Sequence, residues 1–145
     1  MKTYENFIEK IPTFKTSTNE DEVKIRAYVN NNEVGCLTMD ILFSAYYEFD
    51  DVLSEDEFNK LYPEDEIVKI SHIEVNDEHK ESGIAKELMK RGMSLMKKSH
   101  NQFYLNASPM GFSGLNVIDL VKLYKKFGFE ILLDQGHNVL MSVVF

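Results

Sequence analysis

The sequence predicts a mixed α/β domain of the α+β kind, and three observations lead to that prediction. Several segments alternate apolar and polar residues, as half-buried strands do, and two others repeat apolar residues at helical spacing. The clearest elements follow the order of three strands, a helix, a strand, a second helix and two strands. One of these helices joins strands that can lie parallel side by side, whereas the remaining connections favour antiparallel pairs.

The first part of the chain predicts an antiparallel hairpin. Apolar and polar residues alternate over Val23–Val29. The Asn30–Asn32 run tolerates positive φ and favours a turn, so Val34–Phe43 is expected to return as the second strand. Before the hairpin, Thr13–Thr18 fits either an edge strand or a loop, and the apolar residues ahead of Pro12 fit one face of a short helix.

An acidic segment follows, which we interpret as an insertion at about residues 44–66. Its core, Glu48–Glu66, holds nine carboxylates and one lysine. Ser54 and Glu57 have the spacing of a capping box, in which each side chain bonds the other residue's backbone N–H, so a helix is expected to begin here. This helix should run to Leu61 and end before Pro63.

The second half of the chain alternates strands with two amphipathic helices. Apolar residues recur every three or four positions in both helices, and Gly128 supplies a typical helix-ending glycine. The expected elements are a strand at Ile67–Val75, a helix at Gly83–Lys98, a strand at Gln102–Ala107, a loop at Ser108–Gly114, a helix at Leu115–Phe127 and strands at Phe129–Leu133 and Val139–Phe145.

Composition narrows the class of protein. The 145 residues suit one domain, residues 1–145, and 43% of them are hydrophobic, which is enough for a core. The net charge of −8 argues against nucleic acid as a partner and favours cations such as amines. Cys36 is the only cysteine, so neither an internal disulfide nor a cysteine metal cage is expected. The four histidines lack metal-ligand spacing, so no metal is expected. No apolar run has the length of a signal peptide or a membrane span, so we expect a cytoplasmic protein.

The most informative stretch is Ile73–Ala85, in which a strand leads through a polar loop to Gly83 at the start of a helix. The first turn of a helix has unpaired N–H groups and the positive end of the helix dipole, and both favour a bound anion such as a pyrophosphate. The stretch contains neither a Gly-x-Gly-x-x-Gly nor a P-loop fingerprint. From this spacing alone, an ordinary strand-to-helix connection remains an alternative.

Two motifs carry a resemblance to a known family. Lys80–Ala85 resembles the Arg/Gln-x-x-Gly-x-Gly/Ala signature of the GNAT family of N-acetyltransferases, and Leu123–Phe129 resembles that family's Phe/Leu-Tyr-x-x-x-Gly-Phe element. The resemblance covers roughly residues 67–145. It implies a mixed, mostly antiparallel sheet with splayed central parallel strands and flanking helices. The N-terminal helices would be shortened here, because only about 20 residues precede Val23.

The resemblance also implies an activity, the transfer of acetyl from acetyl-CoA (coenzyme A) to a primary amine. Ile67–Val75 and Gln102–Ala107 would part to admit the coenzyme, whose acyl arm would bind the main chain of Ile73 and Val75. The pyrophosphate and its surroundings would involve Lys80, Glu81, Ser82, Gly83, Ile84, Ala85 and Lys86, and Asn116 lies one position from where an asparagine often contacts the pantetheine arm.

The candidate catalytic residues are Tyr124, which the resemblance implies, and Glu74, although the family often places its base on the face of Lys69 and Ser71. Tyr124 would protonate the departing thiolate, a role that suits a phenol that is protonated at neutral pH; the alternative is an aromatic side chain that fills the core. Glu74 is the candidate base if the short N-terminus opens its face of the strand; the alternatives are a buried, paired carboxylate or a capping role. By strict alternation, His72 and Glu74 share one strand face, and Lys69 and Ser71 share the other.

The acceptor is expected to be a cationic small molecule or a peptide or protein amine. The acidic insertion would replace part of the missing acceptor wall, although it also fits a solvated surface insertion. A protein that binds acyl-CoA without catalysis, or a protein-interaction module on the same fold, is the alternative function. A homodimer formed through the last strand is a further expectation.

Overall fold

A computed structural model describes residues 11–79, 82–108 and 116–145. The strands are β1 (Thr13–Thr18), β2 (Glu22–Val29), β3 (Asn32–Leu42), β4 (Ile67–Val75), β5 (Gln102–Ala107), β6 (Glu130–Asp134) and β7 (Val139–Val144). The helices are α2 (Glu55–Leu61), α3 (Ile84–Met96) and α4 (Val117–Lys125), with 3-10 turns η1 (Tyr46–Glu48) and η2 (Asp77–His79). The predicted elements are therefore present, with ends that differ by one or two residues.

Local sequence accounts for several of these elements. Asn30 and Asn31 adopt positive φ values of 53° and 66° between β2 and β3, as the turn prediction requires. The predicted capping box is confirmed, because Glu57 N–H donates to Ser54 Oγ at 3.2 Å and Ser54 N–H donates to Glu57 Oε1 at 3.0 Å. The short helix expected before Pro12 and most of the loop at 108–114 lie outside the described residues.

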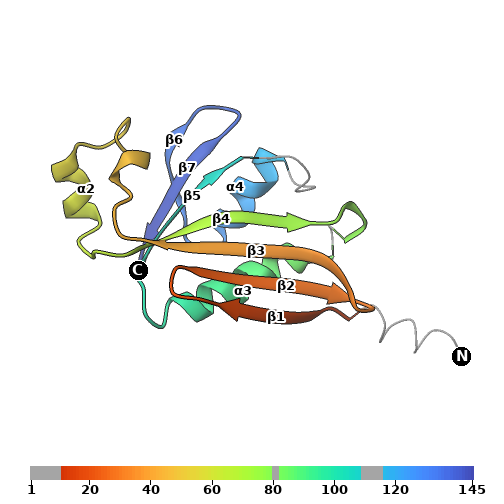
Figure 1. Cartoon of the computed structure of the whole chain (residues 1–145). Coiled ribbons are helices and arrows are strands. Elements are labelled where there is room, and N and C mark those ends of the chain that lie inside the picture. Colours follow the sequence, from red (N-terminus) through yellow and green to blue (C-terminus); the bar gives the residue numbers. More distant parts are fainter. Residues whose placement is uncertain (1–10, 80–81, 109–115) are drawn as a thin grey trace, which may run out of the picture.

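All seven strands form one sheet in the order β1-β2-β3-β4-β5-β7-β6 (Figure 1). Every neighbouring pair is antiparallel except β4–β5, which is parallel and is joined through α3. Thr13–Thr18 is thus an edge strand rather than a loop. The mixed, mostly antiparallel sheet with a central parallel pair confirms the predicted fold class.

The β4–β5 pairing is short. Paired positions run from Val68 with Phe103 to Ile70 with Leu105, although β4 continues to Val75 and β5 to Ala107. Beyond Ile70, within the described residues, the edge of β4 that faced β5 has no strand partner. The two central strands therefore part toward their carboxyl ends, as the resemblance implied.

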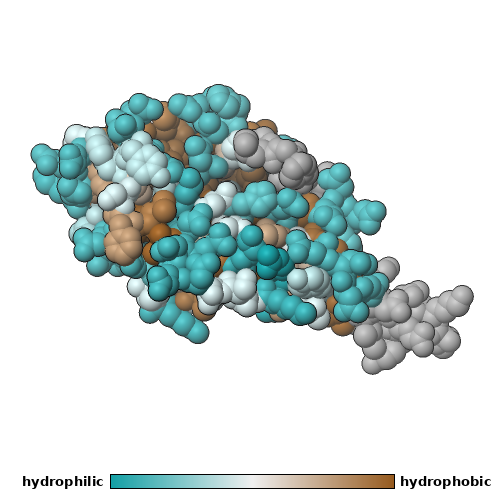
Figure 2. All heavy atoms as spheres, viewed as in Figure 1, coloured by the Kyte–Doolittle hydropathy of each residue, from teal (hydrophilic) through white to brown (hydrophobic). Residues whose placement is uncertain are grey.

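The main core lies between the sheet and the helices α3 and α4, behind the sheet in Figure 1. Leu88, Met89 and Met93 of α3 are buried there. Helix and sheet approach closely at Gly92, where an added Cβ would lie 2.6 Å from a Leu37 methyl carbon. The opposite face of β2 and β3 carries mainly polar side chains, and in the same view Figure 2 shows this region as largely hydrophilic.

A second core forms where the acidic insertion packs on the other face of the sheet. Phe49 is fully buried, and its ring lies 4.9 Å from that of Tyr104 in β5 and 5.3 Å from that of Tyr62. The insertion is thus fixed to the sheet through aromatic residues, with its carboxylates around the edge. Among the described residues, no helix is long and apolar enough to cross a membrane.

The structure corrects one expectation about β4. The register with β3 shifts between Ile70 and His72, which leaves Ser71 as the extra residue of a β-bulge. Lys69, His72 and Glu74 lie opposite Asp40, Thr38 and Cys36, three alternate residues on one face of β3. The prediction that Lys69 and Ser71 face away from His72 and Glu74 is therefore wrong, because strict alternation holds only in a strand without a bulge.

Candidate functional site

The parting of β4 and β5 leaves a notch in the middle of the sheet. A narrow cavity of about 60 Å³ occupies it. Its lining includes Ser71 and His72 of β4, Asn106 and Ser108 at the end of β5, and Leu120 and Tyr124 of α4. Residues from three elements that are distant in sequence therefore meet at the point where the strand pairing ends.

Tyr124 reaches the notch from behind the sheet. It lies in the last turns of α4, is 4% exposed, and packs its ring edge-on against Phe129 at 5.9 Å between centroids. Burial raises the pKa of its phenol above the ordinary value of about 10, so the hydroxyl keeps its proton at neutral pH. The residue thus fills core space and also lines the notch.

The start of α3 lies beyond the end of β4. Gly83 is its N-cap, with a left-handed φ of 84°, and no side chain of the described residues caps this end. An added Cβ at Gly83 would have no heavy atom within 4 Å in the part of the chain that the structure describes, so space is open there beside the backbone. Ser82 and Lys86 are exposed here, whereas Ile84 and Ala85 are buried; Lys80 and Glu81 lie outside the described residues. A helix start that no side chain caps is suited to an anion.

Glu74 and His72 form a pair on the polar face of β4. His72 Nε2 lies 3.1 Å from Glu74 Oε2, and the two side chains are 40% and 32% exposed. His72 lines the notch, whereas Glu74 is not among the residues that line it. Ile73 and Val75, whose main chain was predicted to hold the acyl arm, lie in the part of β4 that has no β5 partner. Glu74 is thus neither buried nor a helix cap.

Asn116 has a structural role that the resemblance to the GNAT family did not imply. It is the N-cap of α4, and its Oδ1 accepts a hydrogen bond from Asp119 N–H at 2.9 Å. This contact holds the start of the helix that carries Tyr124.

No protein-family model and no curated protein matches the chain. Solved structures do match it. Arabidopsis thaliana NAA60 in complex with acetyl-CoA aligns with a TM-score of 0.59 and 18% identity over 88% of this chain and 77% of that one. An acetyltransferase of the GNAT family from Streptococcus pneumoniae aligns with a TM-score of 0.58 and 13% identity over 88% and 70%. The chain has the GNAT fold.

A further GNAT-like match is the PaiA N-acetyltransferase from Thermoplasma acidophilum, solved in complex with coenzyme A. It aligns with a TM-score of 0.55 and 14% identity over 86% of this chain. The present chain spans 62% of the length of that protein. The resemblance read from the two sequence motifs is therefore confirmed for the fold.

On the polar face of the GNAT sheet, a second small cavity of about 90 Å³ adjoins the notch. Glu48 and Asp51 of the acidic insertion line it together with Leu133 and Asn138 of the β6–β7 hairpin. Asn106 lines both cavities, so they lie next to each other. The acidic insertion thus contributes Glu48 and Asp51 to a cavity next to the notch.

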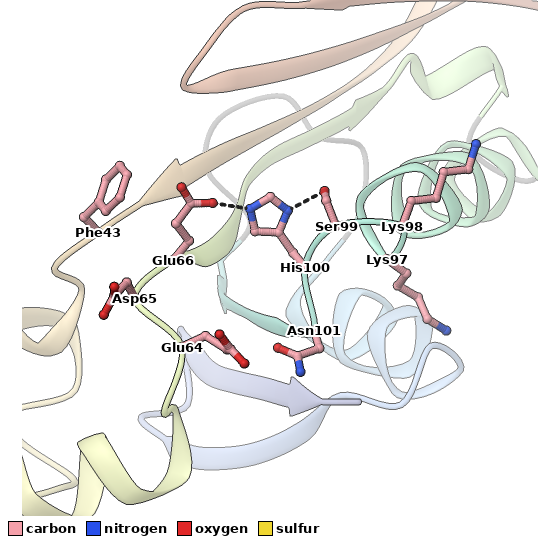
Figure 3. Close-up of a pocket in the computed structure, with 9 residues that line it drawn as sticks. All are labelled: Phe43, Glu64, Asp65, Glu66, Lys97, Lys98, Ser99, His100 and Asn101. Carbon is pink, nitrogen blue, oxygen red and sulfur yellow. Dashed lines mark hydrogen bonds and ion pairs between the residues drawn. The ribbon is translucent and has the colours of Figure 1, made fainter.

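A larger cavity, of about 490 Å³, lies elsewhere in the GNAT fold, at the opposite end of α3 from Gly83 (Figure 3). Three of its lining residues are linked by hydrogen bonds: His100 Nε2 lies 2.6 Å from Glu66 Oε1, and His100 Nδ1 lies 2.8 Å from Ser99 Oγ. Its lining combines the carboxylates of Glu64, Asp65 and Glu66 with the ammonium groups of Lys97 and Lys98, and it lies at the end of α3 where the helix dipole is negative. The smaller notch, where the strand pairing ends beside Tyr124, is the candidate functional site.

Sequence reasoning missed His72 and Asn106 as lining residues. Asn106 did give a signal, because it is a polar residue that interrupts the apolar, buried run of Phe103, Tyr104, Leu105 and Ala107 in β5. His72 gave none, because its position in the notch depends on the bulge and on the point where the strand pairing ends.

Proposed function

We propose that this protein is an N-acetyltransferase that transfers acetyl from acetyl-CoA to a primary amine. The observation that carries the proposal is the parting of β4 and β5 after Ile70, directly beside Tyr124. An unpaired strand edge offers backbone groups to an extended, amide-containing ligand such as the pantetheine arm. The three solved structures compared above include complexes with acetyl-CoA and with coenzyme A.

The cofactor residues in this proposal follow the motif. Ile73 and Val75 would bind the acyl end through their main chain, and the start of α3 would bind the pyrophosphate. Within residues 82–108, the open space beside Gly83 and the lack of a side-chain cap fit a diphosphate held by backbone N–H groups. The full set proposed to contact the cofactor is Ile73, Val75, Lys80, Glu81, Ser82, Gly83, Ile84, Ala85, Lys86 and Asn116.

The chemistry needs an acid behind the sheet and a base in front of it. Acetyl-CoA supplies a thioester carbonyl that the amine attacks. Tyr124 would give its proton to the sulfur that leaves, and its raised pKa keeps that proton available at neutral pH. Glu74, on the opposite face, would take part in removing the amine proton. The carboxylates of Glu48 and Asp51 beside the notch favour an acceptor that is positively charged.

The first test uses the whole chain with acetyl-CoA and four acceptors: 1,4-diaminobutane, spermidine, 2-phenylethylamine and a peptide with a free N-terminus. We expect acetyl-CoA to raise the melting temperature, since a ligand at 100 times its Kd adds about 2.7 kcal/mol to the free energy of unfolding. We also expect one or more amines to release free thiol. Binding without thiol release would instead favour the non-catalytic module, and no binding would refute both functions.

The second test separates the two roles of Tyr124. Tyr124→Phe keeps the ring that packs on Phe129 and removes the hydroxyl. We expect kcat to fall about 100-fold or more, as for the loss of a general acid, with unchanged acetyl-CoA affinity. Tyr28→Phe is the matched control, because Tyr28 lies in β2, away from the notch. Equal activity of the two variants would show that Tyr124 only fills the core.

A further inference from the structure

The bulge in β4 creates an arrangement that the motifs do not contain. Because Ser71 is the extra residue, the His72 side chain lies on the polar face together with those of Lys69 and Glu74. His72 also lines the notch. Tyr124 lines the same notch from α4, which packs on the other face of the sheet. The notch is therefore lined by His72, whose side chain lies on the polar face, and by Tyr124 from the face that carries α3 and α4.

The contact between His72 and Glu74 fixes which imidazole nitrogen is free. Glu74 Oε2 lies 3.1 Å from His72 Nε2, and a carboxylate is an acceptor, so Nε2 carries the hydrogen of this bond. In the neutral imidazole the other nitrogen, Nδ1, then has the lone pair. Among the described residues, no group forms a hydrogen bond with Nδ1. This is the geometry of a base whose tautomer is set by a neighbouring carboxylate.

The other polar groups on this face are less suited to the role. Asp40 accepts a hydrogen bond from Ser71, and neither Asp40 nor Glu74 lines the notch. Lys69 is a cation that pairs with Glu48 at 2.8 Å. The titratable and charged groups on the same face of the sheet as His72 include Glu22, Lys24 and Arg26 from β2, Glu33, Cys36 and Asp40 from β3, Lys69 and Glu74 from β4, and Glu48 from η1.

We propose that His72 is the catalytic base of the transfer and that Glu74 is the residue that positions it. This inference rests on the proposed function and changes the part that Glu74 plays in it. Glu74 acts through His72, whereas His72 Nδ1 contacts the amine. It also adds a catalytic residue that neither sequence motif contains.

The protons balance as follows. An alkylammonium resembles a lysine side chain, with a pKa of about 10.4, so it arrives with a proton that blocks attack. His72 Nδ1 takes that proton, and the freed lone pair forms the C–N bond to the acetyl carbonyl carbon. The second nitrogen proton passes to solvent, the C–S bond breaks, and the sulfur takes its proton from Tyr124. Solvent then reprotonates Tyr124 and deprotonates His72, so one proton is released in each turnover.

The experiment measures thiol release from acetyl-CoA with whichever of the four amines the wild-type chain uses fastest. We expect His72→Gln to lower kcat about 100-fold or more, while the acetyl-CoA affinity stays within about twofold. His72→Ala should recover part of its activity when imidazole is added. Its kcat/KM should also no longer fall toward low pH as the kcat/KM of the wild-type chain does. His137→Gln, an exposed histidine at the β6–β7 turn that lines neither small cavity, is the control and should be unchanged.

Glu74→Gln tests the positioning role. We expect kcat to fall about 10- to 100-fold with an unchanged KM for acetyl-CoA, because the imidazole loses the carboxylate that orients it. Addition of imidazole should not rescue this variant, since its own imidazole still occupies the site.

Each outcome decides a separate point. His72→Gln with wild-type kcat would overturn the base assignment alone, and so would His72→Ala that is slow but insensitive to imidazole. Glu74→Gln with wild-type kcat would overturn the positioning role. A wild-type chain that binds acetyl-CoA and acetylates none of the amines would contradict the proposed function and the base assignment with it.

Discussion

Replacing Gly83 by alanine tests the start of α3 as the diphosphate site. Gly83 has a φ of 84°, which an L-residue adopts at a cost of about 1–2 kcal/mol. The loss of glycine's flexibility in the unfolded chain offsets about 0.4–1 kcal/mol of that cost. The net destabilisation should therefore be about 1 kcal/mol, equivalent to about 3 °C in melting temperature for a domain of this size.

Gly136 is a matched control for the backbone effect. It has a φ of 86° in the β6–β7 turn, and an added Cβ there would also have no atom within 4 Å. Gly83→Ala and Gly136→Ala should therefore lose similar stability. Only Gly83→Ala adds a methyl group where we propose that the pyrophosphate lies.

The difference between the two variants should appear in coenzyme A affinity. A hydrogen bond to a charged group contributes about 1.5–3 kcal/mol, so displacing one or two of them weakens binding at least about 10-fold. Isothermal titration with coenzyme A gives Kd, and thermal unfolding gives stability. If Gly83→Ala binds coenzyme A as tightly as Gly136→Ala, the start of α3 is not the anion site.

Two further predictions concern the cores. Gln102 is fully buried, and its side chain forms hydrogen bonds of 2.8–3.1 Å with the backbone of Glu64 and Glu66. Gln102→Ala should therefore lower the free energy of unfolding, measured by urea titration, by about 3 kcal/mol, and a loss below about 1 kcal/mol would contradict this anchoring role. Burial raises the pKa of Tyr62, Tyr104 and Tyr124 above the ordinary value of about 10. Above a pH of about 10, the unfolded chain therefore binds fewer protons than the folded chain, and the free energy of unfolding should fall by up to about 1.4 kcal/mol per pH unit for each tyrosine. A free energy of unfolding that does not change with pH across that range would refute this prediction.

Much of the fold follows from local patterns. The turn at Asn30–Asn31, the capping box of Ser54 and Glu57, and the glycine at the start of α3 each depend on residues within a few positions of one another. The interactions that stabilise these features therefore depend on short stretches of sequence. For this reason, the ends of the predicted elements agree with the observed ones to within one or two residues.

The notch depends on contacts between strands. The bulge at Ser71 reflects the register of β4 on β3, and the parting after Ile70 reflects how far β5 pairs with β4. Neither is encoded by the alternation within β4, so the sequence misplaced Lys69 and Ser71 relative to His72.

The sequence by itself determined the strands, the helices, their order and the two motifs, because hydrophobic periodicity, caps and turn residues act over a few neighbouring positions. Only the tertiary structure decided that His72 and Tyr124 line one notch and that Glu74 lies behind His72. Those positions result from the pairing of segments far apart in the chain, where a shift of one residue moves a side chain to the other face of the sheet.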